Sequence, residues 1–194
     1  NKYIHHSLLT YKNKNDLYYG GCNIEELEKY GVDKENLNPY YPLHEDEFLN
    51  SEIKVLQLPY FINYNPQSNF YYAKEKSNFE VNPHGRSEGT YTKYASLDDK
   101  IDGLHFYTWF IKTGRGRATD DAGIEIRNKI ITREEGVALV KKYDGEFPKL
   151  YFKEILEYLN MSENEFFDTI DKFRPDHLWE KEGKEWKLKY AVWK

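Results

Sequence analysis

The chain has 194 residues, and 28 Lys and Arg residues against 33 Asp and Glu residues give it a formal charge of −5. Nucleic-acid-binding proteins usually carry a basic footprint, so this balance argues against nucleic acid as a partner, although it leaves room for a local basic patch. Apolar residues make up 39% of the sequence, enough for a buried core and too many for an intrinsically disordered chain.

The single cysteine, Cys22, excludes an internal disulfide bond and a multi-cysteine zinc site, which suits a reducing compartment. No basic-then-apolar signal opens the chain, and its longest apolar stretch is far shorter than the ~20 residues that a bilayer-spanning helix needs. We therefore expect a cytoplasmic protein with no membrane span. Because the first residue is Asn1 rather than Met, we also expect processing, truncation or further upstream sequence.

The turn residues of 1–64 predict a loop-rich segment with short helices and one edge strand. A capping box over 23–26 predicts a short helix that Gly31 ends. Proline-containing turns over 38–42 predict a loop. The apolar run 53–62 predicts a strand, which its internal proline confines to a sheet edge or divides.

Residues 65–194 read as a helical C-terminal domain. Asn65 followed by Pro66 predicts a helix to about Lys76. From Ser96 onward, cap residues and helical periodicity predict helices over 97–112, 120–129, 133–143, 148–160 and 163–173. The alternation over 185–192 predicts a short half-buried strand. The expected fold class is mainly α, a compact helical bundle with a few short strands.

The helix predicted over 97–112 contains the first candidate site. Spacings of four and three residues would place one polar stripe on an otherwise apolar helix, formed by Asp98, Asp102, His105, Trp109 and Lys112. Asp102 would orient the imidazole of His105, and Asp98 with His105 would offer ligands to Mg²⁺ or Zn²⁺. We therefore take Asp98, Asp102 and His105 as candidate catalytic residues. The alternative is a structural hydrogen-bond network between helices.

The next segment, 112–121, has the composition of an anion site. Gly114 and Gly116 permit a tight turn, and a helix beginning at Thr119 would direct its free N–H groups toward the turn. Candidate ligands for a phosphate or carboxylate are Lys112, Arg115, Arg117 and Thr119. A Gly-x-Gly sequence alone is weak evidence for a phosphate site, since neither a full dinucleotide-binding motif nor a P-loop is present. The alternative is a plain turn whose arginines pair with nearby carboxylates.

A Gly-rich loop over 82–94 alternates charged side chains with tyrosines, as loops that contact polar ligands often do. Its candidate substrate-binding residues are Arg86, Glu88 and Tyr91. An ordinary surface loop is the competing interpretation.

Between Asn82 and Trp186, a series of short segments matches one known protein family in the same order along the chain. They include Glu88–Tyr91, Tyr94–Lys100, Gly114–Thr119, Glu125–Arg127, Ile131–Gly136, Lys142–Pro148, Phe152–Glu154, Thr169–Arg174 and His177–Trp179. Together they resemble the C-terminal half of the N-acetyl sugar amidotransferase family of bacterial surface-glycan biosynthesis, which acts on O-antigen and pseudaminic-acid-type sugars.

This resemblance implies the C-terminal part of an α/β ATP pyrophosphatase-type enzyme, with residues 1–64 as the end of its nucleotide domain or as a linker. Such an enzyme uses ATP and Mg²⁺ to activate the acetamido oxygen of a nucleotide-linked N-acetyl sugar, and ammonia from a partner glutaminase then leaves an acetamidino group. The family's Ser-Gly-Gly-x-Asp-Ser loop and cysteine motifs do not occur in the 194 residues, so adenylation is expected to need another part of the protein. The alternative is a docking module for the glutaminase partner or for a homo-oligomer.

Overall fold

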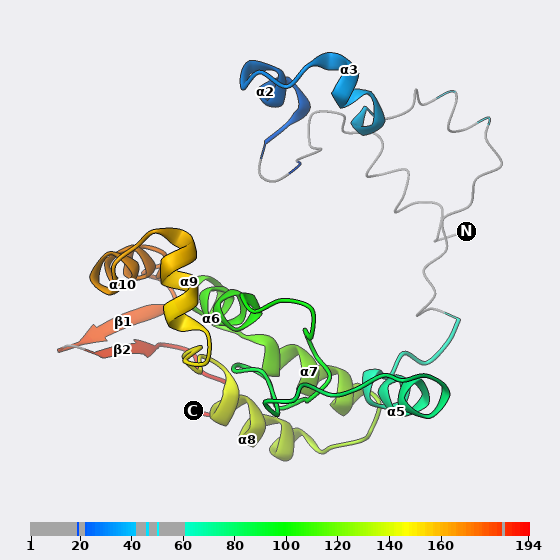
Figure 1. The fold of residues 1–194 in the computed structure, drawn as a ribbon. Coiled ribbons are helices and arrows are strands. Elements are labelled where there is room, and N and C mark those ends of the chain that lie inside the picture. Colours follow the sequence, from blue (N-terminus) through cyan, green and yellow to red (C-terminus); the bar gives the residue numbers. More distant parts are fainter. Residues whose placement is uncertain (1–18, 20–21, 42–45, 47–49, 51–60, 184) are drawn as a thin grey trace. The chain divides into compact units, whose positions relative to one another are not determined.

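The computed structural model describes residues 19, 22–41, 46, 50, 61–183 and 185–194. The chain divides into two compact units, Asn1–Tyr64 and Asn65–Lys194. Across the described residues the elements are helices, together with one small two-stranded sheet (Figure 1). The expected mainly α fold class is thus confirmed. Residues 53–60 of the expected edge strand lie outside the described residues.

The first unit contains two short α-helices, α2 (Ile24–Lys29) and α3 (Lys34–Leu37), and the 3₁₀ turn η2 (Asn38–Tyr40). The capping box is confirmed, since Asn23 Oδ1 accepts a hydrogen bond from the Glu26 N–H and Glu26 accepts one from the Asn23 N–H. Both bonds satisfy amide groups that a helix start would otherwise leave unpaired. The loop expected over 38–42 is instead a 3₁₀ turn at its start, favoured by Pro39 in the first turn.

The second unit opens with α5 (Pro66–Lys76), whose cap Asn65 accepts a hydrogen bond from the Ser68 N–H at 3.1 Å, as expected. Phe70 of this helix stacks on Tyr94 with ring centroids 4.7 Å apart. The ring stacking connects α5 to the loop that precedes the next helix.

Helix α6 (Asp102–Thr113) begins later than the sequence pattern suggests. The start predicted after Ser96 is wrong, because residues 97–101 form bends and turns, and Ser96, with φ 52°, does not have the extended backbone of an N-cap. Asp99 Oδ1 accepts a hydrogen bond from the Ile101 N–H, and this local turn competes with helix formation. Gly114, with φ 72°, ends the helix.

Helices α7 (Arg117–Arg127) and α8 (Arg133–Tyr143) lie side by side (Figure 1). A Cβ at Gly136 would come within 2.7 Å of Ile126, so this glycine permits their close approach. The Thr132 capping box is confirmed. The predicted start of α7 at Thr119 is wrong, because its N-cap is Gly116.

The chain ends with α9 (Phe152–Leu159), α10 (Glu163–Lys172) and the antiparallel strands β1 (Trp179–Glu182) and β2 (Glu185–Leu188). The Ser162 capping box of α10 is confirmed, whereas α9 begins four residues after Pro148 rather than at it. The predicted strand 185–192 ends at Leu188, and the strand that pairs with it, β1, was not expected.

Helix α6 contributes to two hydrophobic clusters of the second unit. Its residues Leu104 and Ile111 pack with α9 and α10, whereas Phe110 packs with Trp179 and Leu188 of the hairpin. The Trp179 indole N–H also donates a hydrogen bond to the Ile111 carbonyl at 2.7 Å. Burial against both sides fixes α6 as the central element of this unit.

Candidate functional site

The second unit contains a cavity of about 400 Å³ at the amino-terminal end of α6. Three loop segments line it, covering parts of 80–88, 96–100 and 148–151, together with Gly103 of α6 and Ile155 of α9. Its size falls in the range of small-ligand pockets, about 300–1,000 Å³. The cavity is therefore the candidate functional site.

The cavity wall combines apolar and polar groups. Apolar lining comes from Val81, Leu97, Pro148, Leu150 and Tyr151, and polar lining from Glu80, Asn82, His84, Ser87, Glu88, Ser96, Asp98, Asp99 and Lys100. Sugars present an apolar ring face and a rim of hydroxyl groups, so a lining of both kinds suits a polyhydroxylated ligand.

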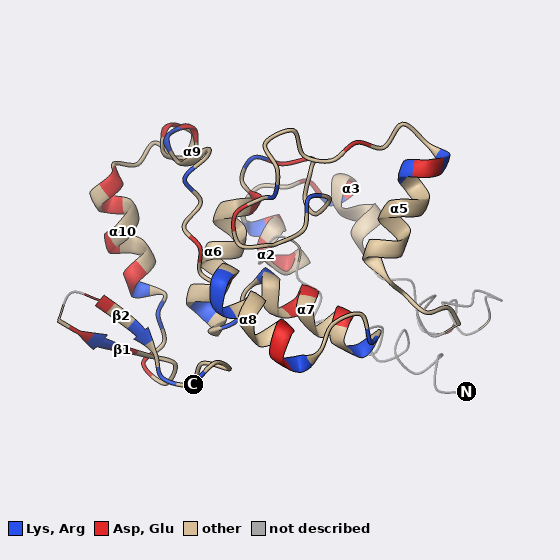
Figure 2. Ribbon diagram, turned by 90° about the horizontal axis from the view of Figure 1, so that it is seen from below, with Lys and Arg blue, Asp and Glu red and all other residues tan. Residues whose placement is uncertain are grey.

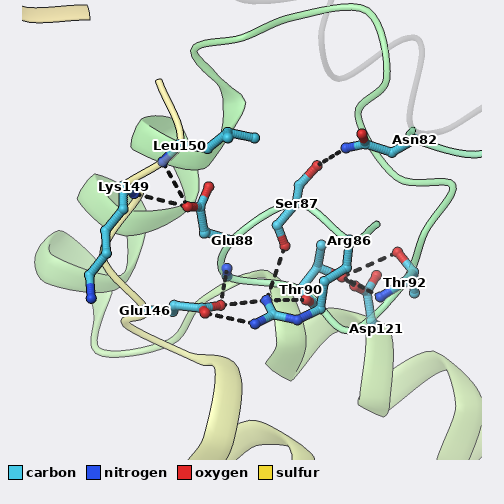
Figure 3. A network of polar contacts seen from close by, with 11 residues as sticks. Asn82, Arg86, Ser87, Glu88, Thr90, Thr92, Asp121, Glu146, Lys149 and Leu150 are labelled. Atoms are coloured by element: carbon cyan, nitrogen blue, oxygen red, sulfur yellow. Dashed lines mark hydrogen bonds and ion pairs between the residues drawn. The ribbon is translucent and has the colours of Figure 1, made fainter. Parts of the chain in front are cut away.

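Glu88 joins two walls of the cavity (Figure 3). Its Oε1 accepts hydrogen bonds from the backbone N–H groups of Lys149 and Leu150, both at 2.9 Å. The third wall is close, since a Cβ at Gly103 would lie 3.5 Å from Glu88 Oε2 and 3.1 Å from Pro148 Cβ. Glu88 thus holds the two walls of the cavity together. Its Oε1 is already occupied by two backbone N–H groups.

Arg86 and Glu146 form a second tie between the same segments of chain (Figure 3). The guanidinium donates two hydrogen bonds to the carboxylate, at 2.5 and 2.7 Å, and another to the Thr90 carbonyl at 3.2 Å. Burial alone would raise the pKa of Glu146, but the bonds from Arg86 and from the Gly89 N–H outweigh it and lower the pKa. Arg86 is consequently engaged within the protein.

A buried network extends from the loop to α7. Thr90 donates to Asp121 Oδ2 at 2.7 Å, and Arg117 donates to Oδ1 of the same carboxylate at 2.9 Å. Thr90 is fully buried, and Asp121 is nearly so. Buried polar groups are costly unless they are paired, so these contacts account for the residue types at the three positions.

Tyr91 donates a hydrogen bond to Glu125 Oε2 of α7 at 3.0 Å. Burial raises the pKa of Glu125; the Tyr91 bond lowers it and the charge of nearby Asp121 raises it, with a net increase. Burial, and then the same two carboxylates, raise the pKa of Tyr94 to about 12. Tyr91 therefore belongs to the interior network and does not line the cavity.

The amino terminus of α7 already holds an anion that the chain itself supplies. Asp144 accepts hydrogen bonds from the Gly116 N–H at 2.8 Å, the Thr119 N–H at 3.2 Å and the Thr119 hydroxyl at 2.5 Å. These are the donors that a phosphate at this helix end would need. The expected anion site at Thr119 is thus filled by an aspartate 25 residues farther along the chain.

A basic and aromatic surface lies on the far side of α6 and just beyond its end. It is formed by His105, Trp109 and Lys112 of the helix and by Arg115, which follows the cap Gly114. The rings of His105 and Trp109 stack with centroids 6.1 Å apart, and the Arg115 guanidinium lies 5.6 Å from the Trp109 centroid. Arg115 also pairs with Asp120 at 3.2 Å. At about 100° per residue, His105 projects about 200° around the helix from Gly103, away from the cavity.

The sequence-predicted site residues therefore do not form one site. Asp98 and Glu88 line the cavity, whereas His105 lies on the far side of α6 and Asp102 is half-buried in its first turn. The predicted single stripe is wrong, because Asp98 precedes the helix by four residues and is exposed. Arg86, Tyr91, Arg117 and Thr119 are used internally, and Lys112 and Arg115 are exposed.

Sequence reasoning missed two structural partners, Asp144 and Glu146, and the cavity residues His84, Asp99 and Lys100. The capping carboxylate and the ion pair join residues 25 to 60 positions apart. No local spacing rule reports contacts of that range. His84 does lie in the Gly-rich loop 82–94, and Lys100 lies in the segment Tyr94–Lys100 that carries part of the family resemblance.

The residues that the structure describes include no group of three or more His, Cys, Asp and Glu side chains that could hold a metal ion. Of the Asp98–His105 metal pair expected from the sequence, Asp98 lines the cavity and His105 does not. This donor set does not fit Mg²⁺–ATP, whose phosphates need a metal site and several cationic or N–H donors in one place. Nor is any described helix long and apolar enough to span a bilayer.

Comparison with known protein families identifies a match to the model described as "LPS biosynthesis protein WbpG-like, C-terminal domain" over residues 88–192. No curated protein matches the chain. The matched region includes Glu88, Asp98 and the 148–151 wall of the cavity, and both strands of the hairpin. It covers more than half of the chain, which therefore belongs to the WbpG-like family of LPS biosynthesis proteins and contains that family's C-terminal domain.

Proposed function

We propose that this chain provides the sugar-binding part of an N-acetyl sugar amidotransferase of surface-glycan biosynthesis, acting in the cytoplasm where nucleotide-linked sugars are made. The observation that carries the proposal is the cavity of about 400 Å³ built largely from the family-matched segment. Asp98 offers free acceptor oxygens to sugar hydroxyls, and Leu150 and Tyr151 offer an apolar surface to the ring.

The overall reaction would convert the acetamido C=O of a nucleotide-linked sugar to C=N–H. ATP would take up the oxygen in AMP, with pyrophosphate as the other product, and ammonia from a glutaminase partner would supply the nitrogen. The described residues do not fit Mg²⁺–ATP, so we assign them no part in adenylation. Their proposed task is to bind and orient the sugar so that its acetamido group is held for reaction.

The direct test is a titration of the 194-residue chain with sugar, in which binding is measured from NMR amide chemical shifts. N-acetylglucosamine, the probe, should shift amides of 82–88, 96–100 and 148–151, and Asp98→Ala should weaken binding several-fold by loss of charge-assisted hydrogen bonds. Glu157→Ala, an exposed change on α9, is the matched control. Shifts confined to other parts of the chain would disprove the proposal.

A second candidate role is docking of the glutaminase partner. The exposed side chains of His105, Lys112 and Arg115, which surround half-buried Trp109, favour it. Trp and Arg are enriched at protein interfaces, and Trp109 here lies against Arg115. Lys112→Glu with Arg115→Glu should abolish capture by the purified glutaminase subunit and leave sugar binding intact. If the double variant instead loses self-association, as measured by light scattering, while glutaminase capture is unchanged, the surface belongs to a homo-oligomer interface.

A further inference from the structure

Glu88 differs from the other carboxylates of its unit in how it is held. Acidic and basic side chains are mixed over α7, α8 and α10 of this unit (Figure 2), so a carboxylate alone does not mark a site. Asp144 and Glu146 also accept backbone N–H groups from distant parts of the chain, but both oxygens of each carboxylate are already bonded. Glu88 bonds the Lys149 and Leu150 N–H groups through Oε1 alone.

The second carboxylate oxygen of Glu88, Oε2, is left for a ligand. The described part of the chain supplies no hydrogen bond or ion pair to it, and Figure 3 accordingly shows dashed lines to one oxygen of this carboxylate and none to the other. Glu88 lines the cavity and is half-buried. Because the bonds to Oε1 already fix the side chain, a ligand that binds Oε2 does not have to order a mobile group.

A narrow apolar corner adjoins Oε2. A Cβ added at Gly103 would lie 3.5 Å from Oε2 and 3.1 Å from Pro148 Cβ, and both of these residues line the cavity. Glycine is unfavourable inside a helix, yet Gly103 lies in the first turn of α6, and the short distance to Pro148 explains why a side chain is absent there. We call Glu88 Oε2, Gly103 and Pro148 the Gly103 corner.

We infer that Glu88 Oε2 accepts the N–H of the sugar's acetamido group, whose methyl group packs against Gly103 and Pro148. The inference rests on the proposed sugar-binding function and names the residue that recognises the acetamido group. A secondary amide is planar and trans, so its N–H and its methyl group lie on one side and its carbonyl oxygen on the other. One fixed acceptor beside an apolar surface is therefore the complement of the N–H side of this group.

This contact directs the carbonyl oxygen away from the Gly103 corner. In the proposed reaction that oxygen is the atom replaced by nitrogen, so it has to remain accessible to the other reactants. A hydrogen bond from the N–H to a carboxylate also polarises the amide and raises the electron density on its oxygen. Glu88 therefore determines specificity and positions the acetamido group, and the transfer steps themselves are assigned to no described residue.

The test compares two ligands that differ only in the atom joining the acetyl group to C2 of the sugar. They are the methyl glycoside of N-acetylglucosamine, which has an N–H there, and the methyl glycoside of glucose O-acetylated at C2, which has an ester oxygen. In NMR amide titrations of the full chain, the acetamido ligand should bind about 10-fold more tightly, because only it can donate to a charged acceptor. The amides of Gly103, Lys149 and Leu150 should shift most.

Glu88→Gln separates this contact from the structural role of the side chain. Glutamine keeps one oxygen for the Lys149 and Leu150 N–H groups and places an NH₂ group at the position of Oε2, where it donates and cannot accept. The variant should therefore bring the affinity ratio of the two ligands to about 1. Glu157→Gln, an exposed change on α9, is the matched control and should leave the ratio unaltered.

Gly103→Ala tests the place of the methyl group. The added Cβ fills the Gly103 corner, so both acetylated ligands should bind several-fold more weakly, whereas the methyl glycoside of glucose, which has no acetyl group, should be affected much less. Gly123→Ala, also within a helix, is the matched control, since its Cβ would have only Arg127 within 4 Å, at 3.4 Å. Unchanged binding of the acetamido ligand to Gly103→Ala would show that the methyl group lies elsewhere and overturn the inference.

The wild-type comparison decides the inference without any substitution. Equal binding of the two acetylated ligands to the wild-type chain, or a ratio that persists in Glu88→Gln, overturns recognition of the acetamido N–H by Glu88 and leaves the proposed sugar-binding function standing. Failure of all three sugars to shift the cavity amides removes the proposed function itself, and the inference with it.

Discussion

Glu125 shows, at the scale of single residues, how a buried carboxylate can serve packing at the expense of stability. It is 8% exposed and accepts a hydrogen bond from Tyr91, and its pKa is raised by burial and by Asp121 despite that bond. A raised folded-state pKa means that the folded chain holds this proton more tightly than the unfolded chain does. The contribution of Glu125 to stability is therefore most favourable at low pH and declines as the pH rises from its ordinary value of 4.5 through the raised value.

Glu125→Gln keeps an acceptor for Tyr91 and removes the buried charge. We expect the stability of the variant relative to the wild type to increase across that pH window and to level off above it. Urea denaturation at a series of pH values measures this, with the exposed Glu157→Gln as control. A relative stability of Glu125→Gln that falls as the pH rises would contradict the assignment.

Asp144 is the residue on which the start of α7 depends. It accepts three hydrogen bonds from Gly116 and Thr119, and no other residue in the described chain is shown bonding these groups. Asp144→Ala should cost about 1–2 kcal/mol of unfolding free energy, as loss of a helix cap usually does. Hydrogen exchange should accelerate first at the amides of 116–119, whereas Asp168→Ala should leave it unchanged.

At the scale of elements, the sequence predicts those helix starts that depend only on neighbouring residues. The capping boxes at Asn23, Thr132 and Ser162 were predicted, because each is complete within four residues. The start of α6 was not, since a left-handed backbone at Ser96 and the turn at Asp99 override the apolar periodicity. Strand β1 was missed because its charged sequence gains its β conformation only by pairing with β2.

The contact between the 144–148 loop and α6 depends on Gly145. It has φ 76°, and a Cβ there would clash with the ring of Phe110, itself in the hairpin cluster. Gly145→Ala should therefore lower the unfolding free energy by about 1–3 kcal/mol more than the backbone term alone. Gly85→Ala is the matched control, since it has φ 100° and nothing within 4 Å of the added Cβ. Equal losses of unfolding free energy in the two variants, measured by thermal denaturation, would contradict this packing role.

Both hydrophobic clusters belong, at the scale of the whole molecule, to the unit Asn65–Lys194. A fragment of these residues should fold by itself, because its core side chains find their partners within it. Its amide spectrum should superimpose on that of the full chain for α6 through β2. A molten spectrum, with narrow amide dispersion, would show that residues 1–64 are needed for folding.

The candidate site was predictable only in part, and the reason also belongs to this scale. Asp98 and Glu88 were named from sequence and do line the cavity, yet the hydrogen-bond partners of Glu88, the backbone N–H groups of Lys149 and Leu150, lie 61 and 62 residues away in the sequence. The expected grouping with His105 assumed one continuous helix. A long-range arrangement of loops replaces it, and neither periodicity nor motif spacing encodes that arrangement.

All four tryptophans, at positions 109, 179, 186 and 193, fall in the unit Asn65–Lys194. Trp179 is 5% exposed and bonded to the Ile111 carbonyl, whereas Trp109 is only half-buried beside Arg115. Tryptophan fluorescence, excited selectively over tyrosine, will consequently report the unfolding of this unit and carry no emission from residues 1–64. Within this unit, buried Trp179 of the hairpin should emit at shorter wavelength than half-buried Trp109 of α6, so collisional quenching by iodide can show which of the two regions opens first.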